Sequence, residues 1–224
     1  MNIQRLTLET NNLETMKDFY SRILELPTRL ENGILYIQIG SSELVFLENP
    51  QTKARYHFAF NIPEQQIDQG IQWLEARVPL ILENGTKKVD FPNWNAYAVY
   101  FADPAGNILE LIARRELTHS EIIPFDSSGL LNISEIGISV PDATVFANWT
   151  EEILGITRYR TGSSSFTSIG DANGLIIAVS IGREWHPNTG ILAEPFYTKI
   201  EFVGEESPIS GVQYLDLPYF FSRV

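Results

Sequence analysis

The chain has 224 residues, 44% of them hydrophobic and 20% charged, which is enough apolar material for one large domain or two modest ones. Its formal net charge of -12 argues against a nucleic-acid backbone or an anionic membrane surface as the default partner. The absence of cysteine excludes disulfides, thiolate nucleophiles and cysteine metal sites.

The N-terminal stretch "MNIQRLTLET" lacks the apolar core of a signal peptide, and no apolar run in the chain is long enough to span a bilayer. We therefore expect a soluble, cytoplasmic protein that binds neither nucleic acid nor membrane. The expected partner is a small molecule, with a homodimer left open.

The first part of the chain predicts a strand, an amphipathic helix and then a hairpin. Residues 3–10 are β-branched and alternate, and Asn12 follows as a helix N-cap. Apolar residues then recur at helical spacing until Pro27. Two strand candidates follow at 33–39 and 43–47.

The pattern begins again at His57. The stretch "HFAFNIP" predicts a strand, and Pro63 opens a helix that carries Ile67, Ile71 and Leu74. Next, "NAYAVYFADPAGNILELIA" predicts a hairpin whose turn is "DPAGN", residues 103–107. If Ala102 pairs with Ile108 in this hairpin, Tyr100 lies opposite Glu110.

An internal repeat appears when the numbering is shifted by 130. Residues 6–26 then lie on residues 136–156 without a gap, and the hydrophobic pattern and the turn positions agree throughout. We predict a complete module at 1–115, a linker at 116–129 and a truncated copy at 130–224. The copy has no second "DPAGN", and Tyr197 takes the place of His57 in it.

The chemistry is expected where polar residues interrupt apolar strands. Alternation along the strands puts His57 and Glu110 on polar faces. A carboxylate flanked by apolar residues, as Glu110 is, costs much free energy to bury unless a cation, an arginine or a shared proton compensates it. His57 and Glu110 are two thirds of a two-histidine, one-carboxylate site, which suits divalent iron and also zinc or manganese.

Three stretches in this order, "NLETMKDFYSRILEL", "HFAF" and "DPAGNILEL", resemble the vicinal oxygen chelate superfamily, which includes glyoxalase I, fosfomycin- and bleomycin-resistance proteins and extradiol dioxygenases. The resemblance covers residues 1–113 well and residues 131–203 more weakly. It implies an α+β fold in which paired βαβββ units form curved mixed sheets around a metal site.

The resemblance places the metal ligands at His57 and Glu110 and the remaining ligand position at Arg5, where the enzymes of this family usually have histidine, glutamine or glutamate. A guanidinium has no lone pair for a metal, so we expect Arg5 to point toward Glu110 and to pair with it. The corresponding residue of the second copy, Glu135, faces Tyr197 in this alignment, and no second site is expected there.

Two hypotheses follow. In a metal-dependent lyase, isomerase or dioxygenase, His57 and Glu110 hold Zn, Mn, Fe or Ni, water or Glu9 fills the remaining position, and Glu110 is catalytic. In a metal-free binding module, an Arg5–Glu110 pair replaces the metal.

Under either hypothesis Arg5, Tyr100 and Trp94 are candidates for binding the substrate. The alternative for His57 is a hydrogen-bonded strand histidine without chemistry. His119 and His186 are expected to be solvated loop residues.

Overall fold

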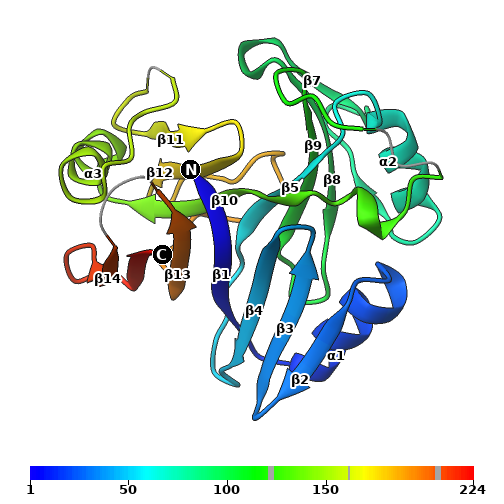
Figure 1. Cartoon of the computed structure of the whole chain (residues 1–224), viewed down its shortest axis with the longest axis horizontal. Helices are drawn as coiled ribbons and strands as arrows, with labels where there is room; N and C mark the ends of the chain where they lie inside the picture. The colour runs from blue at the N-terminus through cyan, green and yellow to red at the C-terminus, as the bar shows by residue number, and fades with distance from the viewer. Residues whose placement is uncertain (121–123, 161, 205–207) are drawn as a thin grey trace.

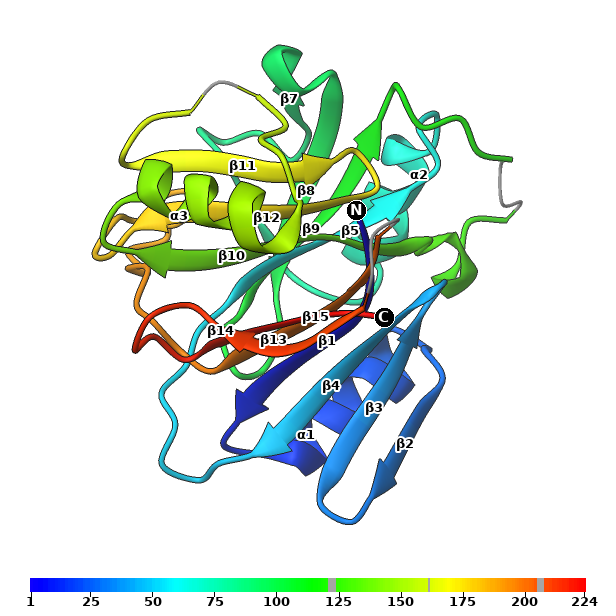
Figure 2. The same ribbon diagram turned by 60° about the vertical axis from the view of Figure 1, so that its left-hand side comes forward.

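The computed structural model describes residues 1–224 except 121–123, 161 and 205–207. Within the described residues the strands form two curved mixed sheets, and helices pack against them (Figures 1 and 2). The predicted α+β class with curved mixed sheets is confirmed. No helix in this part of the chain is long and apolar enough to cross a membrane.

The first sheet has seven strands in the order β14-β15-β13-β1-β4-β3-β2. It joins the beginning of the chain to its end. The bounds are β1 Asn2–Thr10, β2 Thr28–Glu31, β3 Ile34–Ile39, β4 Ser42–Glu48, β13 Thr198–Val203, β14 Ile209–Gln213 and β15 Tyr219–Arg223.

The second sheet has eight strands in the order β11-β12-β10-β5-β9-β8-β6, with β7 also paired to β8. It is built from the middle of the chain. The bounds are β5 His57–Ile62, β6 Leu80–Ile81, β7 Val89–Phe91, β8 Ala96–Ala102, β9 Ile108–Arg114, β10 Asn132–Val140, β11 Phe166–Asp171 and β12 Gly174–Ser180.

The helices α1 and α3 begin where the sequence predicts them, whereas α2 begins at Ile67, four residues after the predicted start at Pro63. Asn12 caps α1 by accepting a hydrogen bond from the Thr15 amide, and Asp142 caps α3 in the same way. The helical segments are α1 Leu13–Asp18, η1 Phe19–Ile23, α2 Ile67–Glu75, η2 Pro92–Trp94, η3 Ser127–Gly129, α3 Ala143–Trp149 and η4 Thr150–Leu154. Both α1 and α3 end in a π-helical turn, η1 and η4.

The repeat is visible in the structure. Strand β10 has the bounds of β1 shifted by 130, and both strands carry a register shift two residues wide at the same place, Ile3/Arg5 and Ile133/Glu135. The last unit is short, because β14 and β15 follow β13 without a helix in the described residues.

The two halves of the repeat do not form separate sheets. β1 pairs with β13 in the first sheet, whereas β5 pairs with β10 in the second, so each sheet contains strands from both halves. The sequence analysis, which divided the chain into two successive modules, did not predict this pairing. The pairing determines which residues meet in the site. The boundaries 1–115 and 130–224 remain our proposal for the sequence units.

Candidate functional site

Three ionisable side chains meet on neighbouring strands of the eight-stranded sheet. Ala59 on β5 pairs with Glu110 on β9 at one edge and with Glu135 on β10 at the other. His57 is two residues before Ala59 and shares its face. One ligand atom from each of His57, Glu110 and Glu135 lies within 4.8 Å of the others, and all three residues are buried.

His57 is arranged to offer a lone pair to this cluster. Its Nδ1 lies 3.3 Å from the Ile108 carbonyl oxygen, which can only accept, so we assign the ring proton to Nδ1. Its Nε2 lies 3.7 Å from Oε2 of Glu110. Burial lowers the pKa of His57 to about 4, so the ring is neutral near pH 7.

Glu110 is held by its neighbour on the hairpin. The observed pairs Ala102–Ile108 and Tyr100–Glu110 confirm the predicted register, and the Tyr100 hydroxyl donates to the Glu110 carboxylate. Burial, and secondly the charge of Glu135, raise the pKa of Glu110 well above its usual range, while Arg114 and Tyr100 oppose this rise. Two buried carboxylates this close therefore favour a bound cation or proton.

Glu135 already has one cationic partner. Arg114, the last residue of β9, forms an ion pair with Glu135 and also donates to the Ser134 hydroxyl at 3.3 Å. The Arg114 side chain is completely buried. Burial raises the pKa of Glu135, and Arg114 acts against this rise.

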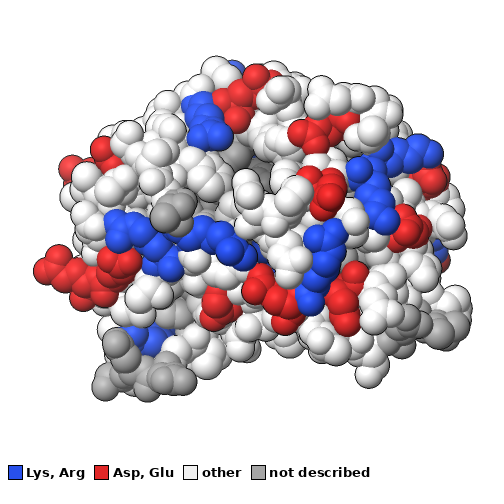
Figure 3. All heavy atoms as spheres, turned by 90° about the horizontal axis from the view of Figure 1, so that it is seen from above, with Lys and Arg blue, Asp and Glu red and all other residues white. Residues whose placement is uncertain are grey.

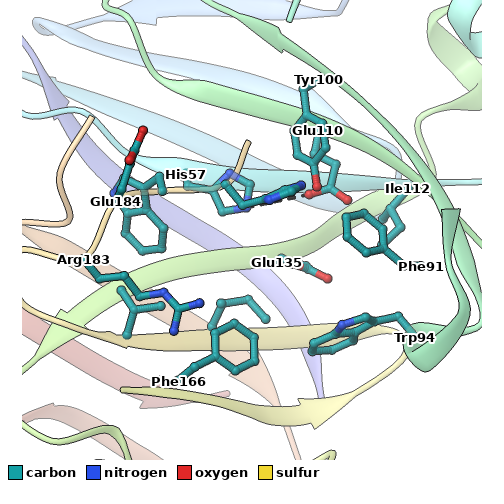
Figure 4. A pocket seen from close by; sticks show the side chains of 14 residues that line it. His57, Phe91, Trp94, Tyr100, Glu110, Ile112, Glu135, Phe166, Arg183 and Glu184 are labelled. Carbon is teal, nitrogen blue, oxygen red and sulfur yellow. Dashed lines mark ion pairs between the residues drawn. The ribbon is translucent and has the colours of Figure 1, made fainter. Parts of the chain in front are cut away.

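The cluster lies in the wall of a cavity of about 230 Å³. Seen from above, the surface of the molecule is hollowed near its centre (Figure 3). Aromatic and aliphatic side chains supply much of the wall, and Figure 4 shows them around the three ligand candidates. The lining residues are His57, Phe91, Trp94, Tyr100, Glu110, Ile112, Glu135, Phe166, Ile177, Val179, Arg183, Glu184, Trp185 and His186.

The segment after β12 closes one side of this cavity. Trp185 packs on His57 with 5.5 Å between the ring centroids. It also lies against Gly137 of β10, where a Cβ atom would come within 2.5 Å of the indole ring. His186 contacts the ring of Tyr100 and lies 3.3 Å from Glu83. His186 is a loop residue with 41% of its side chain exposed, as expected, but it also lines the cavity, which the sequence did not indicate.

Arg5 lies elsewhere, and its predicted approach to Glu110 was wrong. It is on β1 in the other sheet, where its guanidinium pairs with Glu43 at 2.7 Å and approaches Glu201 to 3.6 Å. The reason is strand pairing: β1 pairs with β13 and not with β5 or β10. Glu9, the proposed substitute ligand, is also on β1 and accepts a hydrogen bond from Asn49, which directly follows β4.

The first sheet carries a degenerate counterpart of the cluster. Arg5 pairs with Glu201 in the first sheet as Glu135 pairs with Ala59 in the second. Counting two residues back along each strand, Lys199 corresponds to His57. Ser222 lies opposite Glu201 and therefore corresponds to Glu110. The equivalence of Tyr197 with His57 was therefore wrong by two residues. Two cations and a hydroxyl at the three positions disfavour a bound metal.

The other candidates differ in outcome. Trp94 lines the cavity and stacks on Tyr159, with 5.9 Å between their centroids. His119 is exposed, as expected. Sequence reasoning set Glu135 aside, although the argument applied to Glu110, a carboxylate among apolar strand residues, also applies to "NISEIGISV". Nothing in the sequence pattern marked Arg114, Arg183 or Trp185.

Comparisons with known proteins show which folds and sequences the chain is similar to. No family model matches the chain. The metallothiol transferase FosB of Staphylococcus saprophyticus is 29% identical over 116 residues, which cover 49% of this chain and 74% of FosB. A putative dioxygenase from Bacillus subtilis has a TM-score of 0.61 and 17% identity, covering 92% of this chain and 71% of its own. The chain therefore has the fold of the vicinal oxygen chelate proteins.

A second structure shows the same superfamily fold. A glyoxalase I mutant from Zea mays has a TM-score of 0.56 and 13% identity, covering 89% of this chain and 74% of its own. Both solved structures match about nine tenths of the chain. The vicinal oxygen chelate fold therefore extends over the shortened C-terminal units, which the sequence resemblance covered only weakly.

Proposed function

We propose that this protein binds one divalent metal ion through His57, Glu110 and Glu135, and that the ion holds two neighbouring oxygen atoms of a small molecule in the cavity. The carrying observation is the convergence of three buried donor atoms within 4.8 Å. Donors bound to one ion at about 2.1 Å lie up to about 4.2 Å apart, so the side chains need to close by roughly half an ångström.

The donor set indicates which ions suit the site. One imidazole with two carboxylates is richer in oxygen than the usual two-histidine set, which favours Mn²⁺ or Fe²⁺ over Zn²⁺ and Ni²⁺. Three protein ligands leave coordination positions open for a substrate. The similarity to a metallothiol transferase supports a metal-dependent role.

The residues around the ligands have separate roles in this proposal. A bound divalent ion supplies Lewis-acid polarisation of substrate oxygens. Tyr100 orients Glu110 and presents its hydroxyl beside the substrate, Trp94 forms part of the aromatic wall, and Trp185 covers His57. This arrangement suits a metal-dependent lyase, isomerase, transferase or dioxygenase.

One observation favours a second candidate, a metal-free binding module. Arg114 already compensates the charge of Glu135, so the cluster carries less uncompensated charge than two bare carboxylates would. In this case the cavity holds its ligand without converting it. The predicted reason for a metal-free site, an Arg5–Glu110 pair, no longer applies.

Metal analysis separates the two candidates. The purified protein is stripped with a chelator, loaded separately with Mn²⁺, Fe²⁺ (without oxygen), Zn²⁺ or Ni²⁺, and analysed for bound metal after desalting. We expect close to one ion per chain with at least one metal and loss of that ion in His57→Ala. The control is His119→Ala, which changes an exposed histidine. If no metal is retained under any loading condition, the metal-free module is the better description.

A further inference from the structure

We propose that Arg183 binds an oxyanion group of the substrate, so that the substrate class is a small molecule with vicinal oxygens at one end, an apolar or aromatic body, and a carboxylate or a phosphate-like group at the other. This inference rests on the proposed function for the end held by the metal. It assigns a separate role to the other side of the cavity.

Arg183 is the one lysine or arginine among the described residues that line the cavity. Figure 4 shows its guanidinium pointing into the space between the strands, on the side of Phe166 and away from Tyr100 and Glu110. An anion bound there lies across the cavity from the metal ligands. Apolar side chains, among them Ile177 and Val179, also line this cavity.

Among the residues that the structure describes, no carboxylate forms an ion pair with the guanidinium of Arg183. Arg183 is an exposed residue whose side chain donates a 3.0 Å hydrogen bond to the Ser165 carbonyl oxygen and lies over the ring of Phe166, whose centroid is 5.2 Å away. Its charge also acts on the neighbouring His186. Its neighbour Glu184 instead accepts a hydrogen bond from the Gly190 amide at 2.6 Å. Most other arginines form ion pairs with carboxylates, namely Arg5, Arg22, Arg29, Arg77, Arg114, Arg115, Arg158 and Arg160.

This arrangement is that of a preorganised anion receptor. A guanidinium has five N–H donors in a planar fork, and one hydrogen bond to Ser165 leaves donors free for a carboxylate or phosphate. Stacking on Phe166 limits the rotamers of the side chain, so less entropy is lost when an anion binds. In a chain with a net charge of -12, an arginine beside a cavity that has no carboxylate partner among the described residues is available to bind an anionic group of a ligand.

A series of catechols tests the inference, because catechol supplies two vicinal oxygens without an anion. The probes are catechol and its derivatives with a carboxylate attached directly, through one methylene or through two, and the corresponding phosphonates. Dissociation constants are measured by calorimetry on the Mn²⁺-loaded protein and on the chelated protein. We expect at least one carboxylate or phosphonate to bind about tenfold or more tightly than catechol, and Arg183→Gln to remove this difference while leaving catechol binding unchanged.

The outcomes separate the two proposals. The control Arg55→Gln changes an exposed arginine away from the cavity and is expected to bind as wild type. If catechol binds only with metal and no anionic derivative binds more tightly, the role of Arg183 is overturned and the metal site stands. If an anionic derivative is preferred equally by Arg183→Gln, Arg183 is likewise excluded. If no metal binds, the proposed function fails, and the role of Arg183 is then tested on the metal-free protein with benzoate and phenylphosphonate. Loss of their binding in Arg183→Gln supports the inference. Binding that is unchanged in Arg183→Gln overturns it.

Discussion

The guanidinium of Arg114 and the carboxylate of Glu135 form a buried ion pair between β9 and β10. This contact joins the last strand of one repeat unit to the first strand of the next, and it holds one of the three candidate metal ligands. A charge buried in this way is costly when its partner is removed, since neither water nor another cation replaces it.

Replacing Arg114 with Met is therefore expected to destabilise the metal-free protein by about 3–5 kcal/mol. Chemical denaturation measures this loss, and saturating Mn²⁺ is expected to reduce it because the ion compensates Glu135. The double variant Arg114→Met/Glu135→Gln is the control. Its loss is expected to be smaller than the sum of the single losses, and strict additivity would show that the two side chains do not interact.

Substitutions at corresponding positions of the two sheets are expected to affect metal binding differently. Glu135→Gln removes a ligand and is expected to weaken Mn²⁺ binding more than about 100-fold, beyond what changes around a ligand usually cost. Arg5→Met, at the corresponding position of the first sheet, is expected to leave Mn²⁺ binding unchanged. Because Arg5 is about half exposed, its loss costs less than about 1 kcal/mol of stability. Competition titrations with a metal-sensitive dye measure both variants.

The raised pKa of Glu110 predicts a pH dependence of the metal-free protein. Its folded pKa lies above the ordinary value of 4.5, so the folded state binds the proton more tightly than the unfolded state. The stabilisation is complete below pH 4.5 and is lost as the pH rises through the folded pKa. His57, with its lowered pKa, acts in the opposite sense.

The measurement for this prediction is the difference in unfolding free energy between wild type and Glu110→Gln from pH 4 to pH 8. We expect wild type to lose stability relative to the variant as the pH rises, and added Mn²⁺ to abolish the trend. A difference that does not depend on pH would mean that Glu110 titrates alike in the folded and unfolded states.

The close contact between Gly137 and Trp185 predicts that adding a single methyl group at Gly137 lowers the stability of the fold. In Gly137→Ala the new Cβ meets the indole ring of Trp185, so the segment that covers His57 has to shift. We expect a loss of about 1–3 kcal/mol, as for other overpacked sites, and a change in tryptophan fluorescence. Trp185→Phe removes the clashing ring atoms, so the double variant is expected to regain stability relative to Gly137→Ala. An unchanged spectrum in Gly137→Ala would argue against this packing.

The mixed composition of the sheets predicts the behaviour of a nicked chain. If a protease site is engineered at Ser120, cleavage leaves the pairs β1–β13 and β5–β10 to hold the fragments together. The two fragments are expected to elute together from a sizing column and to separate in denaturant. Their separation under native conditions would indicate that the halves are independent bodies.

Local sequence patterns determined much of this protein. Alternation along the strands placed His57 and Glu110 on the polar face, the "DPAGN" turn set the pairing of Tyr100 with Glu110, and the 130-residue repeat predicted β10 and α3. These features depend on short-range geometry, namely the two-residue period of a strand, the turn of a hairpin and the cap of a helix. Each of these patterns lies within one short, continuous segment of the chain.

Tertiary structure decided which residue completes the site. Arg5 and Glu135 occupy equivalent places in the repeat, and nothing local distinguishes which of them pairs beside His57. The choice is made when β5 pairs with β10 and β1 with β13, contacts between segments far apart in the chain. The ladder hydrogen bonds are the same in either pairing, so the selection comes from how whole units pack, with Ser42 bridging β1 and β10 and Arg114 paired to Glu135.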